Sequence, residues 1–337
     1  MNICSADLAM NVSVQMLSEI SCQGKPTYRW VLDDKTTFQT TVTTTSIACP
    51  FTILLNILVI IAVKQRRELQ KNSNILLAIL AVADVLVGAI SMPLTTTLDV
   101  LILLRYVNNP HFCRILFINQ LVLYSLCYSS VYHLTLIAWE RYVAIRKCME
   151  YRSIVTKGRI SKYSSIAWLV SLVVPLPSRI MRMADVYIDY EYLRVINILS
   201  LLPAAVCIIL TGYFYLMIYL RVRRRKNDEM SQVGAVVNAT KVAKTTGILT
   251  AALIVSFIPS MTILCFGDAL PALQRSSFFL WAMMLSQLNS LFNPILYCFR
   301  DHRFRNAILE MLKIKQPEFK TWKANVAQNI RRSCTIE

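Results

Sequence analysis

The feature that most constrains this chain is the run of residues 115–139, which contains no Asp, Glu, Lys or Arg and is followed at once by Glu140 and Arg141. A run of this length crosses a bilayer, because ~20 apolar residues at 1.5 Å each cover a ~30 Å hydrocarbon core. Glu140 and Arg141 are therefore predicted where a helix leaves the membrane. A charge pair at that place is either an interfacial anchor or part of a functional site.

Six further charge-poor runs share this character. They are residues 39–63, 74–98, 163–178, 195–220, 245–267 and 276–299. With 55% hydrophobic and only 16% charged residues, the chain is typical of polytopic membrane proteins. The fold class predicted is an all-α membrane protein, a seven-transmembrane helix bundle.

Apolar residues recur at helical spacing after the last run and predict a short amphipathic eighth helix on the membrane surface. They are Phe304, Ile308, Leu309 and Leu312. The predicted organisation is an amino-terminal tail at 1–38, the bundle at 39–300, the eighth helix at 301–313 and a second tail at 314–337.

Basic residues set the expected orientation. If the amino terminus is extracellular, 9 of the 36 Lys and Arg residues, Arg179 among them, fall on the outer side and 27 on the inner side. The positive-inside rule then predicts a multi-pass plasma-membrane protein with an extracellular amino terminus and a cytosolic carboxyl terminus. The net charge of +17 favours contact with anionic membrane lipid or with an acidic partner protein.

Other function classes lack their signatures. The excess of basic residues does not combine with aromatic residues into a face that binds nucleic acid, so no nucleic-acid partner is expected. Ten cysteines and three histidines have no ligand-like spacing, so no metal site is predicted. His133 and Asp84 stand alone in their spans and supply no catalytic set, so no enzyme is expected. A transporter would show paired broken segments, and no internal repeat is present.

Polar residues inside the spans predict an interior polar seam, because such groups in hydrocarbon usually face other helices. Asp84 is the one carboxylate deep in a span. The accompanying neutral groups are Asn56, Ser130, Asn289, Ser290 and Asn293. This seam either surrounds a small cation or water cluster, or simply joins helices by hydrogen bonds.

Several short motifs, in the order in which they follow one another along the chain, make it resemble the rhodopsin-like (class A) G-protein-coupled receptors from about residue 45 to 313. The matching positions are Asn56, Leu80 to Asp84 (LAVAD), Glu140-Arg141-Tyr142, Trp168, Tyr215, Pro259, Asn293 to Tyr297 (NPILY) and Phe304. The resemblance implies a receptor that converts binding of an extracellular ligand into activation of a heterotrimeric G protein.

The family mechanism assigns expected roles. Arg141 would leave Glu140 and reach the G protein and Tyr215, while Tyr297, next to the kink at Pro294, would move to meet them. Tyr142 belongs to the same motif, and Met149 resembles the apolar residue that packs on the G protein. The polar seam would hold an allosteric sodium ion, the only cofactor implied.

Some positions depart from the family pattern. Residues 178–194 contain no cysteine, so the usual bridge to the third span cannot form, and Cys113 with Cys22 is the pairing expected instead. Phe257 stands at the toggle-tryptophan position and Cys207 at that of the fifth-span proline. Asn11 begins a glycosylation sequon.

The resemblance also places a ligand pocket. Its expected wall is Asp99, Leu123, Tyr124, Cys127, Phe257, Ser260, Met261, Met283 and Gln287. Leu123 replaces the aspartate of amine receptors and Gln287 the retinal lysine of opsins, so a peptide, nucleoside or lipid-like ligand is expected. The departures resemble the melanocortin, adenosine, cannabinoid and lysolipid branch. The alternative is a seven-span decoy or scaffold that binds ligand without signalling.

Overall fold

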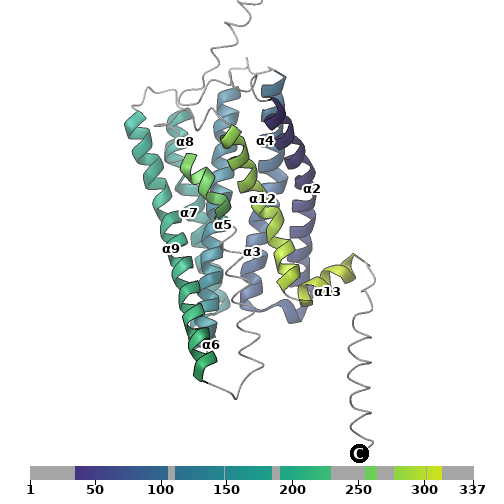
Figure 1. Ribbon diagram of the computed structural model, residues 1–337, viewed down its shortest axis with the longest axis vertical. Coiled ribbons are helices and arrows are strands. Elements are labelled where there is room, and N and C mark those ends of the chain that lie inside the picture. Colours follow the sequence, from purple (N-terminus) through teal and green to yellow (C-terminus); the bar gives the residue numbers. More distant parts are fainter. Residues whose placement is uncertain are drawn as a thin grey trace, which may run out of the picture.

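The computed structural model describes residues 35–104, 111–147, 149–183, 190–228, 255–263, 277–300 and 302–312. Within these ranges every regular element is a helix, and the long helices stand side by side in one bundle (Figure 1). The elements are α2 (Lys35–Gln65), η2 (Arg67–Leu69), α3 (Asn72–Leu86), η3 (Val87–Ser91), α4 (Met92–Leu103), α5 (Phe112–Arg146), α6 (Tyr151–Ile154), α7 (Lys157–Val173), α8 (Leu176–Met183), α9 (Tyr190–Asp228), α12 (Ser277–Arg300) and α13 (His302–Met311).

The predicted all-α bundle is confirmed. Five stretches among the described residues are long and apolar enough to cross a membrane. They are Lys35–Gln65, Asn72–Leu103, Phe112–Arg146, Lys157–Met181 and Arg194–Arg221. The helix at residues 255–263 and α12 occupy the places predicted for the sixth and seventh spans.

The fourth span is longer than its charge-free run predicts. Instead of residues 163–178, α7 starts at Lys157 and α8 ends at Met183. Thr156 caps the start, accepting a hydrogen bond from the backbone N–H of Arg159 at 3.3 Å. Long basic side chains in the first turns reach water while their stems stay apolar, so the helix extends past the uncharged run.

The second span changes helix type in its middle. Val87–Ser91 forms a π-helical segment between α3 and α4. Gly88 sits in this segment, and a Cβ added there would meet Cγ1 of Ile53 on α2 at 2.8 Å. The Sγ of Cys49 also donates to the carbonyl oxygen of Gly88 at 3.1 Å. The missing side chain therefore lets α2 approach the π-helical backbone closely.

The central element of the bundle is α5. In the most apolar 18-residue stretch of α5, 83% is buried inside the protein, against 22% in the corresponding stretch of α9. The exposed side of α9 is apolar, with Ile198, Leu202, Ile209 and Leu216 among its exposed side chains. In a membrane such a face contacts lipid.

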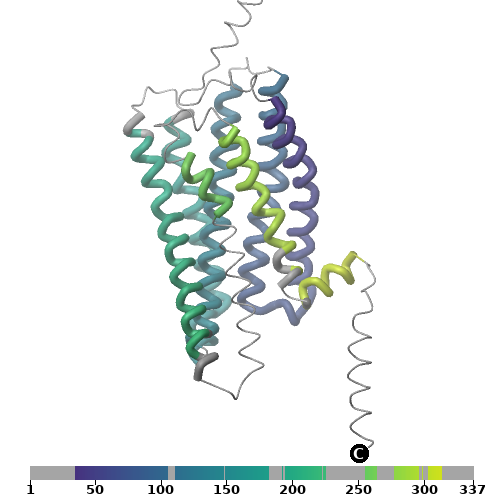
Figure 2. The backbone as a smooth tube through the Cα atoms, in the orientation of Figure 1, coloured from purple at the N-terminus to yellow at the C-terminus, as the bar shows by residue number. Residues whose placement is uncertain are grey.

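The predicted eighth helix is confirmed as α13, which leaves the bundle axis at a sharp angle at its lower end (Figure 2). Part of its apolar face packs against the bundle. Phe304 and Ile308 are buried in the same cluster as Leu58 and Leu76. An ion pair between Arg66 and Glu310 joins α13 to the chain just after α2.

Candidate functional site

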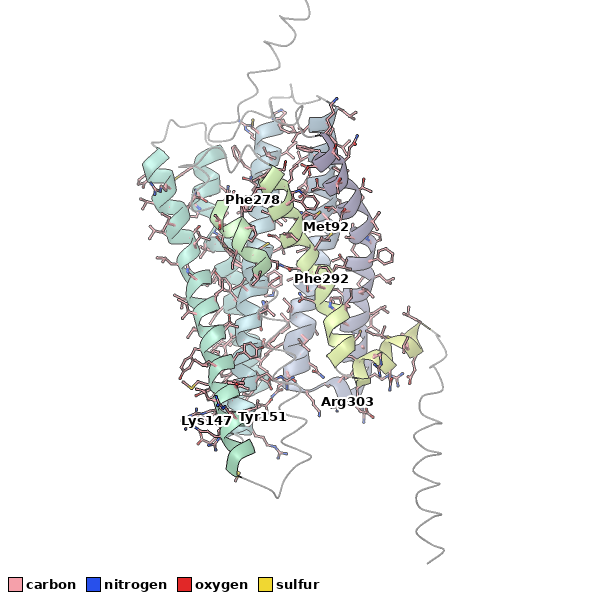
Figure 3. All side chains as sticks on the ribbon, in the orientation of Figure 1. Met92, Lys147, Tyr151, Phe278, Phe292 and Arg303 are labelled. Carbon is pink, nitrogen blue, oxygen red and sulfur yellow. The ribbon has the colours of Figure 1, made fainter. Side chains whose placement is uncertain are left out.

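The acid–arginine pair lies near the carboxyl end of α5. Tyr151 lies at the lower end of the bundle (Figure 3), which we call the Tyr151 end. Glu140 is 2% exposed, and its Oε2 lies 3.4 Å from Nε of Arg141. Neither atom has a hydrogen-bond partner among the described residues. Arg141 is therefore held here by charge attraction rather than by a directional bond.

The other carboxylate oxygen of Glu140 is bound by Tyr151 of α6. Tyr151 Oη donates to Glu140 Oε1 at 2.6 Å. Burial raises the pKa of the Tyr151 phenol, and the bond to Glu140 raises it further. Asn72 Nδ2 donates to the carbonyl oxygen of Val155 at 2.7 Å and so anchors the segment behind α6. The phenol is thus kept as a neutral donor to a buried carboxylate.

The remaining residues predicted to couple lie at the same end or outside the described side chains. The centre of the Tyr142 ring lies 5.3 Å from the centre of the Phe214 ring on α9, and this contact joins α5 to α9. Tyr215 is half-buried beside it on α9. Met149 is 95% exposed, and its contact with a G protein stays a prediction. The side chain of Tyr297 lies outside the described residues.

The predicted polar seam lies midway along the bundle. Asp84 is fully buried, and Asn293 Nδ2 donates to its Oδ2 at 2.8 Å. Asn56 Nδ2 donates to the backbone oxygen of Ser290 at 2.9 Å. The seam thus joins α2, α3 and α12, the last of these through the turn before Pro294.

Asp84 keeps one carboxylate oxygen for a further partner. Its Oδ1 has no hydrogen-bond partner in the part of the chain that the structure describes. Ser130 donates to the backbone oxygen of Leu126 at 3.1 Å, which leaves its lone pairs for a cation. Hard oxygen donors around one carboxylate suit a small cation, so these residues fit the implied sodium ion.

Asn289 has a partner that the sequence did not indicate. Ser256 Oγ, on the helix at residues 255–263, donates to Asn289 Oδ1 at 2.5 Å. One turn further, Ser260 and Ser286 share a second hydroxyl hydrogen bond. Two hydrogen bonds therefore tie the sixth helix to α12.

A cavity opens in the half of the bundle opposite Tyr151, which we call the Asp99 end. It is lined from α2, α4, α5 and α12. Of the residues predicted for the pocket, Asp99, Leu123, Met283 and Gln287 line it. Its other lining residues are Phe38, Thr41, Thr45, Thr95, Leu98, Ile102, Leu116, Asn119, Gln120, Phe279, Leu280 and Met284.

The other five predicted pocket residues do not line this cavity. Tyr124, Cys127, Phe257 and Met261 belong to a packed apolar cluster between α5, α9 and the sixth helix, and Ser260 is bonded to Ser286. This cavity thus lies toward α2 and α4 from those five residues, and their place in a ligand pocket stays a prediction. One reason for the position of the cavity is volume: large side chains such as Phe257 fill the space between α5 and the sixth helix.

Sequence reasoning missed two contacts. Tyr151 lies 11 residues after Glu140 in a short helix, and no local pattern connects them. Arg179 was counted among outer-loop residues, but it lies in α8 and is 5% exposed. The available signal was Pro177, since proline in a first turn favours a new helix.

Two sequence predictions concern the amino-terminal tail. Cys113 is disulfide-bonded, whereas Cys49, Cys127, Cys207 and Cys298 are free thiols. The predicted partner Cys22 and the sequon at Asn11 lie outside the described residues, so both stay predictions.

Comparison with known proteins gives the same family as the motifs. The model of the 7 transmembrane receptor (rhodopsin family) matches residues 55–297. The chain is similar to adenosine receptor A2a of Homo sapiens, with 26% identity over 293 residues that cover 77% of this chain and 69% of the receptor. It is 27% identical over 289 residues to adenosine receptor A3 of Canis lupus familiaris, and these residues cover 77% of this chain and 87% of the receptor.

A third relative is adenosine receptor A3 of Bos taurus, 25% identical over 282 residues, which cover 77% of this chain and 86% of the receptor. The predicted resemblance, including its adenosine-like branch, is therefore confirmed. The family is one of receptors in the plasma membrane, not of enzymes. The chain belongs to the rhodopsin family of seven-transmembrane, G-protein-coupled receptors.

Proposed function

We propose that this receptor binds an extracellular ligand in the cavity at the Asp99 end and activates a heterotrimeric G protein at the Tyr151 end. The observation that carries the proposal is the state of Arg141, whose Nε faces Glu140 across 3.4 Å without a hydrogen bond. A cation held by charge alone is easily transferred to another partner. Separation from Glu140 would expose it to a G protein beside Met149.

The physical basis is a shift between two packings of one bundle. A ligand favours whichever packing it binds better, and only by that difference in affinity. Between cavity and coupling end lie the Asp84–Asn293 bond and the two bonds from the sixth helix to α12. These bonds are candidates for the contacts that differ between the two states.

Nucleosides are the first ligand class to test. The relatives are named adenosine receptors, and the cavity wall offers neutral amides and hydroxyls from Thr95, Asn119, Gln120 and Gln287. Peptide and lipid-like ligands are the other classes. The amino terminus is proposed to be extracellular, which places the Tyr151 end in the cytosol among the basic residues.

A sodium ion is proposed as an allosteric ligand of the seam. Asp84 would supply its charge, with Ser130 and Asn289 as neutral neighbours. Bound there, the ion would favour the packing in which these residues converge, and so the resting receptor.

Ligand-free nucleotide exchange tests the function directly. The full chain in lipid nanodiscs is mixed with purified G proteins, and exchange is compared with that of Arg141→Ala, alone and with adenosine. Basal exchange that depends on Arg141 supports a signalling receptor. Exchange equal to that of empty nanodiscs, with every G protein and with adenosine bound, would instead identify a decoy.

A further inference from the structure

The buried arginine at the Asp99 end has partners of an unusual kind. Arg179 Nη1 donates to Gln120 Oε1 at 2.9 Å, and its guanidinium carbon lies 4.7 Å from the centre of the Tyr124 ring. These two contacts are both with α5, and both involve uncharged side chains. A hydrogen bond and a cation–π contact together fix the plane of the guanidinium.

This contact determines which way the Gln120 amide points. A guanidinium only donates hydrogen bonds, so the amide atom that faces it must be the oxygen. Gln120 lines the cavity and has no other hydrogen bond in the described part of the chain. Its Nε2 is therefore left as a donor at the cavity wall.

Gln287 presents the opposite polarity. Its Nε2 donates to Thr95 Oγ1 at 2.9 Å and to Ser91 Oγ at 3.3 Å. Its Oε1 is buried and has no hydrogen-bond partner among the described residues, although the side chain is only 1% exposed. A buried acceptor without a partner costs free energy, so a ligand donor at this point would bind favourably.

The charge of the wall restricts the ligand further. Asp99 is the one charged side chain among the residues that line the cavity, and Arg179, which contacts Gln120 and Tyr124, is not among those residues. No cation of the described wall therefore awaits an anionic ligand.

We infer that Arg179 is a positioning residue that sets ligand specificity through Gln120. It fixes Gln120 as a donor, while Gln287 offers an acceptor, so that the cavity takes a ligand without a negative charge that carries a hydrogen-bond acceptor and a donor at separate points. This inference rests on the proposed function only in taking the cavity as the ligand site.

The test is direct binding of adenosine to the purified full chain in nanodiscs, without G protein. The variants are Gln120→Met, Gln287→Met, Arg179→Met, Arg179→Lys and the double change Arg179→Met with Gln120→Met. Arg114→Met, an exposed arginine on α5, is the matched control. Adenosine 5′-monophosphate serves as the anionic probe, and the melting temperature of each variant reports folding.

Each glutamine change is expected to weaken adenosine binding roughly tenfold, as for one lost hydrogen bond. Arg179→Met should weaken it similarly, and the double variant no further, because both changes remove one interaction. Arg179→Lys should retain part of the affinity, since it keeps one donor for Gln120. Adenosine 5′-monophosphate should bind less well than adenosine.

Several results would overturn the inference. One is additive losses in the double variant, which would make Arg179 a structural residue. Another is tighter binding of adenosine 5′-monophosphate that is lost in Arg179→Met, because the arginine would then contact the anion itself. Absence of adenosine binding would also overturn it, while Arg141-dependent basal exchange would leave the proposed function standing.

Discussion

Tyr151 donates a hydrogen bond from its phenolic hydroxyl to Glu140 at 2.6 Å. Glu140 therefore contacts both Arg141, its neighbour in sequence, and a residue of α6. Glu140 is buried, and a buried carboxylate needs hydrogen bonds as well as a nearby cation. In the structure, Tyr151 supplies that hydrogen bond.

Replacing Tyr151 with Phe should therefore raise ligand-free nucleotide exchange. The change keeps the ring and removes one hydrogen bond to a charged group, so a rise of roughly tenfold is expected. The measurement is basal exchange in nanodiscs. Tyr163→Phe is the matched control, since the Tyr163 ring packs edge-on against Trp139. Basal exchange unchanged by Tyr151→Phe would show that the bond does not favour the resting state.

The same bond predicts a stability loss at alkaline pH. A phenol whose pKa is raised on folding binds its proton more tightly in the folded state. Its stabilisation is complete below the ordinary value of about 10 and falls as pH rises from there toward the folded-state pKa. Thermal melting of the wild type should thus decline more steeply above about pH 10 than that of Tyr151→Phe. Parallel curves for the two proteins would contradict this.

Asp84→Asn should remove any dependence of stability on sodium. When sodium is about ten times its Kd, a bound ion stabilises the folded state by ~1.4 kcal/mol. The measurement is thermal melting with sodium replaced by N-methylglucamine at constant ionic strength. Glu310→Gln, an exposed acid paired with Arg66, is the control and should keep the wild-type response. A wild type that is insensitive to sodium would rule out the proposed ion.

The bond between Ser256 and Asn289 should favour the resting packing of the sixth helix. Ser256→Ala removes it, and an interhelical hydrogen bond in a membrane is worth about 0.6 kcal/mol. If the bond is confined to the resting state, basal exchange should rise roughly threefold. Thr262→Val is the control, because among the described residues Thr262 hydrogen-bonds within its own helix, to the backbone oxygen of Ile258. Equal basal exchange in both variants would show that the Ser256 bond persists on activation.

Gly88→Ala should destabilise the bundle without touching a predicted ligand or coupling residue. The new Cβ would lie 2.8 Å from Ile53 Cγ1, and such overpacking costs about 1–3 kcal/mol. Gly212→Ala on α9 is the control, since nothing lies within 4 Å of a Cβ there. Melting temperatures of the two variants give the comparison. Equal melting temperatures would mean that α2 moves aside freely.

The sequence predicted the spans, the eighth helix and the residues of the polar seam, because charge-free runs and local motifs depend on neighbours in sequence. It did not predict that the described cavity extends toward α2 and α4. That depends on how Phe257 and Tyr124 fill the space between helices, which is a matter of packing. It also missed Tyr151 and Arg179, whose partners are 11 and 59 residues away.

The π-helical segment Val87–Ser91 lets the second span absorb a change of length by one residue. A π turn accommodates one residue more than an α turn, and each residue of an α-helix turns the chain by about 100°. Deleting one residue here would convert the π turn to an α turn and leave Asp84, Thr95 and Asp99 close to their present orientations, whereas deleting one residue of α4 before Asp99 would rotate Asp99 by about 100° relative to Asp84. The π-helical segment is thus the place along this span where a change of length by one residue is expected to be tolerated.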